Sequence, residues 1–256
     1  MDWGLAGATA ISRGAHYAVI VDVLSFTTAV SVAVDRHAEV YPYPWRDDSA
    51  RDFARRHRAV LAAGRSEAAP DDIHRQRSST SERPPISLSP ASIRAAARLD
   101  RIVLPSPNGS ALTSAMAQTN DRIPILAACL RNRTAVAAWL ASQSSPPAGP
   151  AIIAIVAAGE RWPDDSLRPA AEDLWGAGAV IGALDSLGMT GLSREARSAA
   201  AAWRAVEHDL GPALASCTSG GELAGTGFGA DVAIAGELDT STSIPLLDNG
   251  RFTNAS

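Results

Sequence analysis

Residues 17–30 read Tyr17-Ala-Val-Ile-Val-Asp22-Val-Leu-Ser25-Phe-Thr27-Thr28-Ala-Val30. The apolar run predicts a buried strand over 18–23, and the Ala- and Val-rich sequence after the hydroxyl-rich turn predicts a helix over 27–34. An acid at this point lies at the carboxyl edge of a sheet, beside the N–H groups of a helix start. α/β proteins bind metals and phosphates there. Asp22 is therefore a candidate site residue, the alternative being a helix cap or another structural acid.

Strand-like and helix-like stretches alternate along the rest of the 256 residues. This alternation predicts an α/β fold, a complex mixed or parallel sheet flanked by helices. Residues 70–90 are polar and irregular and predict a long loop. Residues 143–150 form a Ser/Pro/Gly connector, a candidate boundary between two lobes of a single domain over 1–256. Further strands are predicted at 39–43, 59–63, 101–104, 123–128, 151–157, 231–235 and 240–247, and helices at 47–57, 92–98, 110–118, 134–142, 170–187, 193–210 and from Pro212.

The chain contains no lysine, because all 23 residues counted as Lys and Arg are arginine. Schiff-base enzymes, pyridoxal-phosphate enzymes and Walker-type nucleotide hydrolases need a lysine, so these classes are excluded. A net charge of −4 with interspersed signs favours neither nucleic acid nor an anionic membrane as a partner. No apolar run has the length of a membrane span, and no leader opens the chain. Two cysteines make no disulfide framework, so we expect a cytoplasmic protein.

The turn Pro105-Ser-Pro-Asn108-Gly109-Ser110 follows the strand predicted at 101–104. Asn-Gly makes a tight turn, glycine permits close backbone approach, and Ser110 is placed to cap the next helix. This turn is a candidate phosphate cradle, the alternative being an ordinary strand-to-helix turn. Arg65 also follows a predicted strand, where a guanidinium suits a phosphate or sulfonate group.

Glu172 and Asp173 lie near the start of the helix predicted over 170–187. Acids suit the helix dipole there, which is a sufficient structural reason for them. Successive helix residues point about 100° apart, so one acid can face a site while the other holds the scaffold or faces solvent. Mg²⁺ needs only one or two carboxylates with substrate oxygens and water. Asp22 with Glu172 or Asp173 would satisfy that need.

The glycine-rich run Gly225-Thr-Gly227-Phe-Gly229-Ala230 has the composition of a dinucleotide fingerprint. It precedes the strand predicted at 231–235, whereas such fingerprints follow a strand, so a plain loop is predicted instead.

These pieces, in this order, resemble the 2-phosphosulfolactate phosphatase family, and the resemblance extends from about Val19 to Pro245. The resemblance implies a Mg²⁺-dependent acid phosphatase acting on a small, multiply anionic phosphate ester, in metabolism that leads toward coenzyme M. It also implies a complex α/β fold and a homo-oligomer. The motifs that carry it are Asp22-Val-Leu-Ser25-Phe26-Thr27-Thr28 (family DVLRATT), Pro107-Asn108-Gly109-Ser110 (TNGT), Ala158-Gly159 with Glu172-Asp173-Leu-Trp-Gly-Ala177-Gly178 (AG…EDxxxAG), and Cys217-Thr-Ser-Gly220 with Leu223, Gly227-Phe228 and Asp231.

The chain departs from the family pattern in the first motif, in the ERGG segment and in the NSP segment, which reads Leu88-Ser89-Pro90. Ser25 stands where the family has arginine, and Gly64-Arg65-Ser66-Glu67 keeps only the arginine of the ERGG segment. Losing such contacts weakens the binding of a substrate that carries phosphate, sulfonate and carboxylate together.

The sequence therefore predicts hydrolysis of 2-phosphosulfolactate or a related phospho-hydroxy acid, with direct attack by water favoured over a phosphorylated Asp22. The alternatives are a phosphatase for another ester and a catalytically inactive relative that binds an anionic metabolite. In the enzyme hypothesis Asp22, Glu172 and Asp173 serve catalysis and hold Mg²⁺, and Arg65, Asn108, Gly109, Ser110, Thr27 and Thr28 bind the substrate.

Overall fold

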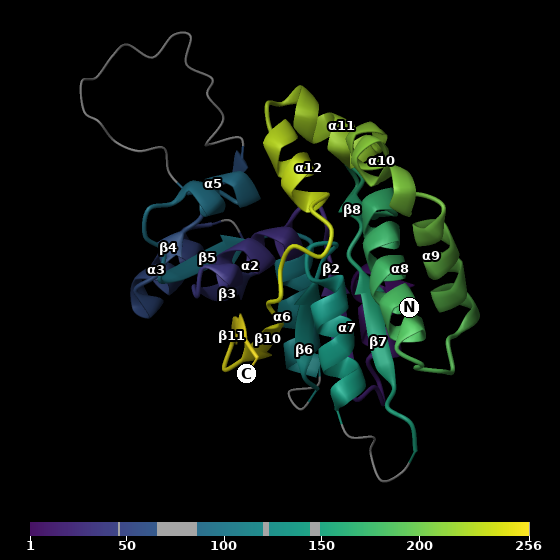
Figure 1. Cartoon of the computed structure of the whole chain (residues 1–256). Helices are drawn as coiled ribbons and strands as arrows, with labels where there is room; N and C mark the ends of the chain where they lie inside the picture. The colour runs from purple at the N-terminus through teal and green to yellow at the C-terminus, as the bar shows by residue number, and fades with distance from the viewer. Residues whose placement is uncertain (46, 66–85, 120–122, 144–148, 256) are drawn as a thin grey trace, which may run out of the picture.

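Nine strands form one large sheet in the computed structural model, which describes residues 1–45, 47–65, 86–119, 123–143 and 149–255 (Figure 1). Two further short strands, β8 (Glu160–Arg161) and β9 (Leu167–Arg168), pair separately. In spatial order the strands of the large sheet are β1 (Asp2–Trp3), β7 (Ile153–Ala157), β2 (Tyr17–Val21), β6 (Ile125–Ala128), β10 (Pro245–Asp248), β11 (Arg251–Asn254), β3 (Glu39–Tyr43), β5 (Arg101–Pro105) and β4 (Val60–Leu61).

The large sheet consists of two parallel groups joined by a hairpin. β1, β7, β2 and β6 form one parallel group, and β3, β5 and β4 form the other. The hairpin of β10 and β11 lies between them and pairs antiparallel with both neighbours. Strand β7 follows the 143–150 connector and pairs with β1 and β2, so segments before and after the connector share one sheet. Residues 144–148 of that predicted boundary lie outside the described residues.

Helices cover both faces of the first parallel group because β2 is apolar on both sides. Val19 and Val21 pack in a cluster that includes residues of three helices on one face, and Ala18 and Ile20 pack with two helices on the other. The first three helices are α7 (Arg133–Ser142), α8 (Ala171–Ser186) and α9 (Arg194–Arg204); the other two are α1 (Gly4–Ile11) and α6 (Gly109–Thr119). A strand buried on both faces is typical of a parallel sheet, as the run 18–21 predicts.

The remaining helices cover the second parallel group and one end of the sheet. α12 contacts α5, and α10, α11 and α12 contact one another at the end of the sheet shown uppermost in Figure 1. These helices are α2 (Phe26–Asp35), α3 (Asp48–His57), α5 (Pro90–Ala95), the 3-10 segment η1 (Glu207–Asp209), α10 (Leu210–Ser216), α11 (Thr218–Gly225) and α12 (Gly229–Ala235).

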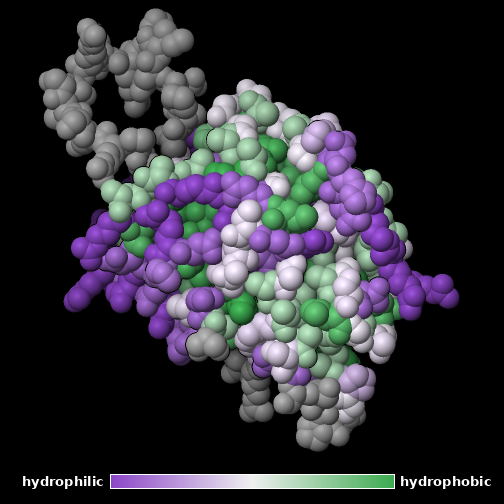
Figure 2. Space-filling model, in the orientation of Figure 1, coloured by the Kyte–Doolittle hydropathy of each residue, from purple (hydrophilic) through white to green (hydrophobic). Residues whose placement is uncertain are grey.

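Amphipathic helices form the outer surface. α9 buries Ala199 and Trp203 while Arg194, Glu195 and Arg197 are exposed. Figure 2 accordingly shows hydrophilic residues along the edge where Figure 1 places α9. Among the residues that the structure describes, no helix combines the length and apolar character needed to cross a membrane.

The α/β prediction is confirmed, but the predicted strand at 231–235 is wrong. These residues belong to α12, and the glycine run before them joins two helices, α11 and α12. A run as short as Val232-Ala-Ile-Ala235 does not distinguish a buried strand from a buried helical turn. The tertiary structure selects the helix by burying Val232 and Ile234 in hydrophobic clusters.

Other differences concern segments without a clear periodic signal. The sequence did not predict β1, α1, β8, β9, α11 or β11, which are short or glycine-rich. The helix predicted over 193–210 ends at Arg204 and continues as η1. Of the loop predicted over 70–90, residues 70–85 lie outside the described residues, Ser87 forms a β-bridge with Ala63, and Pro90 already begins α5.

The close packing of α8 on α9 requires glycine at position 178. A Cβ at Gly178 would overlap the backbone carbonyl of Ala199, whereas one at Gly182, a turn later in α8, would lie 3.7 Å from Trp203 Cδ1, an ordinary contact. We expect Gly178→Ala to lower the free energy of unfolding by about 1–3 kcal/mol, because the helices must move apart. Gly182→Ala is the control and should be neutral or slightly stabilising, since alanine favours a helix. Urea unfolding measures both, and equal midpoints for the two variants would contradict this account.

Candidate active site

The Asp22 carboxylate joins the first turns of two helices. Asp22 follows β2 directly and is 5% exposed. Its Oδ1 accepts a hydrogen bond from Phe26 N at 3.0 Å, and its Oδ2 accepts one from Gly109 N at 2.9 Å. Phe26 begins α2 and Gly109 begins α6. The positive ends of both helices therefore stabilise this carboxylate, and the segments that follow β2 and β5 meet at it.

Only glycine fits at position 109. A Cβ there would overlap the Phe26 ring and lie 2.8 Å from Asp22 Oδ2. The predicted close backbone approach therefore occurs, and it is made to a carboxylate of the protein itself.

The adjacent acids Glu172 and Asp173 have different surroundings. Asp173 Oδ1 accepts from Val23 N at 2.7 Å, and Oδ2 accepts from Gly159 N at 2.8 Å. Asp173 is 3% exposed and ties the residues after β2 to those after β7. Burial, followed by the charges of Asp22 and Glu172, raises the pKa of Asp173 well above its ordinary value. Asp173 thus anchors the backbone segments that follow β2 and β7, while Glu172 points in a different direction.

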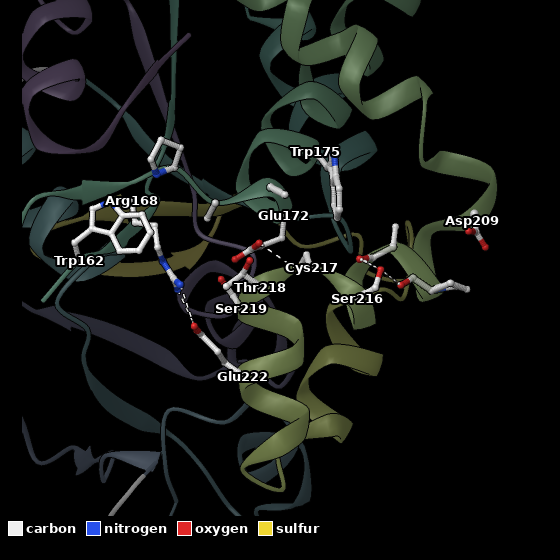
Figure 3. Close-up of a pocket in the computed structure, with 15 residues that line it drawn as sticks. Trp162, Arg168, Glu172, Trp175, Asp209, Ser216, Cys217, Thr218, Ser219 and Glu222 are labelled. Carbon is white, nitrogen blue, oxygen red and sulfur yellow. Dashed lines mark hydrogen bonds and ion pairs between the residues drawn. The ribbon is translucent and has the colours of Figure 1, made fainter.

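Glu172 lines a pocket of about 940 Å³ between the starts of α8 and α11 (Figure 3). The Cys217 thiol donates to Glu172 Oε2 at 3.3 Å. Burial and the Glu172 charge raise the pKa of Cys217 to about 12, which keeps the thiol protonated as a donor. At the other side of this pocket Arg168 binds both carboxylate oxygens of Glu222, at 2.9 and 3.0 Å, beneath the Trp162 ring.

Asp22 faces a different, smaller pocket of about 110 Å³, lined also by Arg65, Asn108 and Glu160. Glu160 is the second acid of this pocket, and Asn108 Nδ2 donates to its Oε2 at 2.8 Å. Burial raises the pKa of Asp22 to about 6. Burial and then the Asp22 charge raise the pKa of Glu160 to about 7. The two carboxyl groups therefore repel each other across a site with little water to screen them.

This pair has the chemistry of a Mg²⁺ site that needs further ligands from substrate and water. A divalent cation beside Asp22 and Glu160 would relieve their repulsion, and hard oxygen ligands suit Mg²⁺. Within the described ranges, no group of three or more His, Cys, Asp or Glu side chains is arranged to hold a metal. A Mg²⁺ ion at this pair would therefore have at most two protein ligands and would take the others from substrate and water.

Arg65 is the cation of the pocket that contains Asp22. Its Nε donates to Asp231 Oδ2 at 3.2 Å, its Nη2 donates to Ser25 Oγ, and its guanidinium lies 5.7 Å from the Phe228 ring centre. Asp231 is 1% exposed and also accepts from Ser89 Oγ at 2.5 Å and Ala91 N at 3.2 Å. The guanidinium is therefore held from several sides at the pocket wall.

Residues 8–250 match the family model described as 2-phosphosulpholactate phosphatase. The chain belongs to this family. The match covers nearly the whole chain, including every strand of the two parallel groups except β1 and every residue of the pocket around Asp22. The predicted resemblance is thereby confirmed. A search of curated proteins found no match.

Three hydroxyl groups predicted to bind the phosphatase substrate donate hydrogen bonds to backbone carbonyls. Thr27 Oγ1 donates to Asp22 O at 2.8 Å, Thr28 Oγ1 to Val23 O at 2.8 Å, and Ser110 Oγ to Leu104 O at 2.6 Å. All three residues are fully buried, and none lines the pocket around Asp22. In this phosphatase-family fold they shape the turns after β2 and β5.

Sequence reasoning assigned no role to Glu160, Asp231 or Phe228. Glu160 follows the Ala158-Gly159 motif at the end of β7, and an acid after a buried strand is the signal that had identified Asp22. Asp231 and Phe228 belong to the C-terminal family motif, but only the structure places them beside Arg65.

The anchoring role of Asp173 predicts a loss of stability in Asp173→Asn. The amide group presents an NH₂ to one of the two backbone N–H donors, so a buried donor loses its acceptor, which costs about 1–3 kcal/mol. Urea unfolding should show this decrease, and Asp185→Asn, at an exposed position of the same helix, should leave the midpoint unchanged. An Asp173→Asn variant as stable as the parent protein would refute the anchor.

The raised pKa of Glu160 predicts that stability falls as pH rises. Between about pH 4.5 and about pH 7 the folded protein holds a proton on Glu160 that the unfolded chain has lost. The contribution of this proton to the stability of the fold is complete below about pH 4.5 and is lost as the pH rises through about 7. Glu160→Gln does not ionise and keeps an oxygen for Asn108. The free energy of unfolding of this variant should exceed that of the parent protein by at most about 3 kcal/mol at pH 8 and equal it at pH 4.

Thermal unfolding with a chelator present measures this difference. Glu207→Gln, in η1, is the control variant. A gain from Glu160→Gln that is the same at both pH values would contradict the titration account.

Proposed function

We propose that the chain is a Mg²⁺-dependent phosphatase for a small anionic phosphate monoester, 2-phosphosulfolactate or a related phospho-hydroxy acid. The observation that carries this proposal is the pocket of about 110 Å³ in which two buried carboxyl groups, Asp22 and Glu160, lie with Arg65 and Asn108. Membership of a phosphatase family supports it independently.

In this proposal Arg65 and Asn108 bind the phosphoryl oxygens. The guanidinium suits a phosphoryl group, and its bonds to Asp231 and Ser25 reduce the conformational freedom lost on binding. The Asn108 amide, already in the pocket, adds a neutral donor. The backbone N–H of Gly109 is engaged by Asp22, so it serves the site by fixing that carboxylate.

Asp22 and Glu160 would hold Mg²⁺. We place Glu160 in this role because it shares the pocket with Asp22, whereas Glu172 lines the larger pocket and Asp173 joins the backbone after β2 to the backbone after β7. When bound, the ion would neutralise phosphoryl charge and lower the pKa of a water. The N–H groups of Phe26 and Gly109 keep the Asp22 carboxylate oriented toward the pocket.

A second candidate function is binding of an anionic metabolite without turnover. The observation that favours it is that polar groups of the site already have partners within the protein. Arg65 is paired with Asp231, and each Asp22 oxygen already accepts a hydrogen bond. The same contacts would hold an anion without chemistry. Ligand-dependent thermal stabilisation with no phosphate release would identify this function.

Phosphate release from 2-phosphosulfolactate, 2-phospholactate and p-nitrophenyl phosphate, with Mg²⁺ and with chelator, tests the enzyme proposal. We expect chelator-sensitive turnover that Asp22→Asn lowers by about 10²–10³-fold, because charge stabilisation in the transition state is lost. Arg65→Gln should raise KM more than it lowers kcat. Asp185→Asn and Arg204→Gln, at exposed positions of α8 and α9, should retain activity. Full activity of Asp22→Asn would refute the site assignment.

A further inference from the structure

A second pocket, of about 260 Å³, adjoins the pocket around Asp22. Pro107, Asn108 and Glu160 line both, so the hydrogen bond between Asn108 and Glu160 lies at their boundary. The pocket around Asp22 is the smaller of the two, at about 110 Å³ against about 260 Å³, so the adjoining pocket offers the organic part of an ester more space.

The wall of this adjoining pocket is predominantly apolar. Trp3, Leu5, Leu112 and Leu167 line it, and Leu5 and Leu167 remain 51% and 41% exposed. Exposed leucines around a concavity are typical of a ligand pocket, because a bound apolar group removes them from water. A compact sulfonate-bearing three-carbon chain would leave most of this surface uncovered.

One cation stands at the edge of the apolar wall. Arg161 Nη2 donates to Pro107 O at 3.1 Å, which holds the guanidinium beside a residue common to both pockets. The ion pair of Arg161 with Asp165 is long, at 3.8 Å, and both side chains are exposed, at 45% and 87%. Such a pair contributes little, so the guanidinium is available to a ligand carboxylate.

We infer that the adjoining pocket binds the organic part of the substrate, an apolar body with a carboxylate near Arg161. The inference rests on the proposed function, in which the phosphoryl group occupies the pocket around Asp22. It narrows the substrate class to phosphate esters of hydroxy acids with a sizeable apolar group. Specificity then lies in Arg161 and Leu167, outside the residues proposed to hold phosphate and metal.

Non-hydrolysable phosphonates separate this inference from the phosphatase proposal. Calorimetric titration of the full chain with methylphosphonate, benzylphosphonate and 4-carboxybenzylphosphonate measures binding without turnover. We expect affinity to rise in that order, with 4-carboxybenzylphosphonate binding about tenfold more tightly than benzylphosphonate. We call this tenfold difference the carboxylate step. Arg161→Gln should abolish the carboxylate step and leave benzylphosphonate affinity unchanged. Leu167→Asp should weaken both ring-bearing ligands, and Arg204→Gln, at an exposed position of α9, should change nothing.

Three outcomes would overturn the inference: benzylphosphonate binding no tighter than methylphosphonate, a carboxylate step that survives Arg161→Gln, or no binding of any of the three. If the expected order is found but no phosphate ester is hydrolysed, the pocket assignment stands and the phosphatase proposal fails.

Discussion

Two hydrogen bonds to one carboxylate organise the centre of this protein. Phe26 N and Gly109 N both donate to Asp22, so the first turns of α2 and α6 converge on a single buried charge. Each helix begins after a strand of a different parallel group, β2 in one case and β5 in the other. A short hairpin joins these groups within the sheet, and Asp22 joins them again at their functional ends. The positive helix ends compensate the burial of the charge, which explains why a carboxylate is tolerated there.

The other buried acids differ in the hydrogen-bond donors that surround them, and their roles differ accordingly. Asp173 uses both oxygens to hold the backbone after β2 and β7. Glu172 accepts a hydrogen bond from the Cys217 thiol and faces the larger pocket in Figure 3. Glu160 receives one side-chain amide and remains open to the pocket of Asp22. Burial raises the pKa of Asp22, and burial together with the Asp22 charge raises the pKa of Glu160, as is common for carboxyl groups at functional sites.

The cationic side of the site depends on the C-terminal helices. Arg65 follows β4, but Asp231 and Phe228, which position it, come from α12 and the residue just before it. Ser25 stands where the resemblance predicts arginine, and its hydroxyl accepts from Arg65. One guanidinium therefore stands here, where the family pattern has two arginines.

Local patterns in the sequence were sufficient for the alternating strands and helices, for the strand that ends at Asp22 and for the Asn108-Gly109 turn, because each depends on residues close together in the chain. They were also sufficient for the family, since four motifs occur in register. They did not distinguish Glu172 from Asp173, because adjacent helix residues diverge by about 100° and only the packing of α8 decides which way each points. Nor did they reveal Glu160 beside Asp22, or Asp231 beside Arg65, which are 138 and 166 residues apart in sequence. Such pairs, and the choice of helix over strand at 231–235, depend on burial that exists only after the chain has folded.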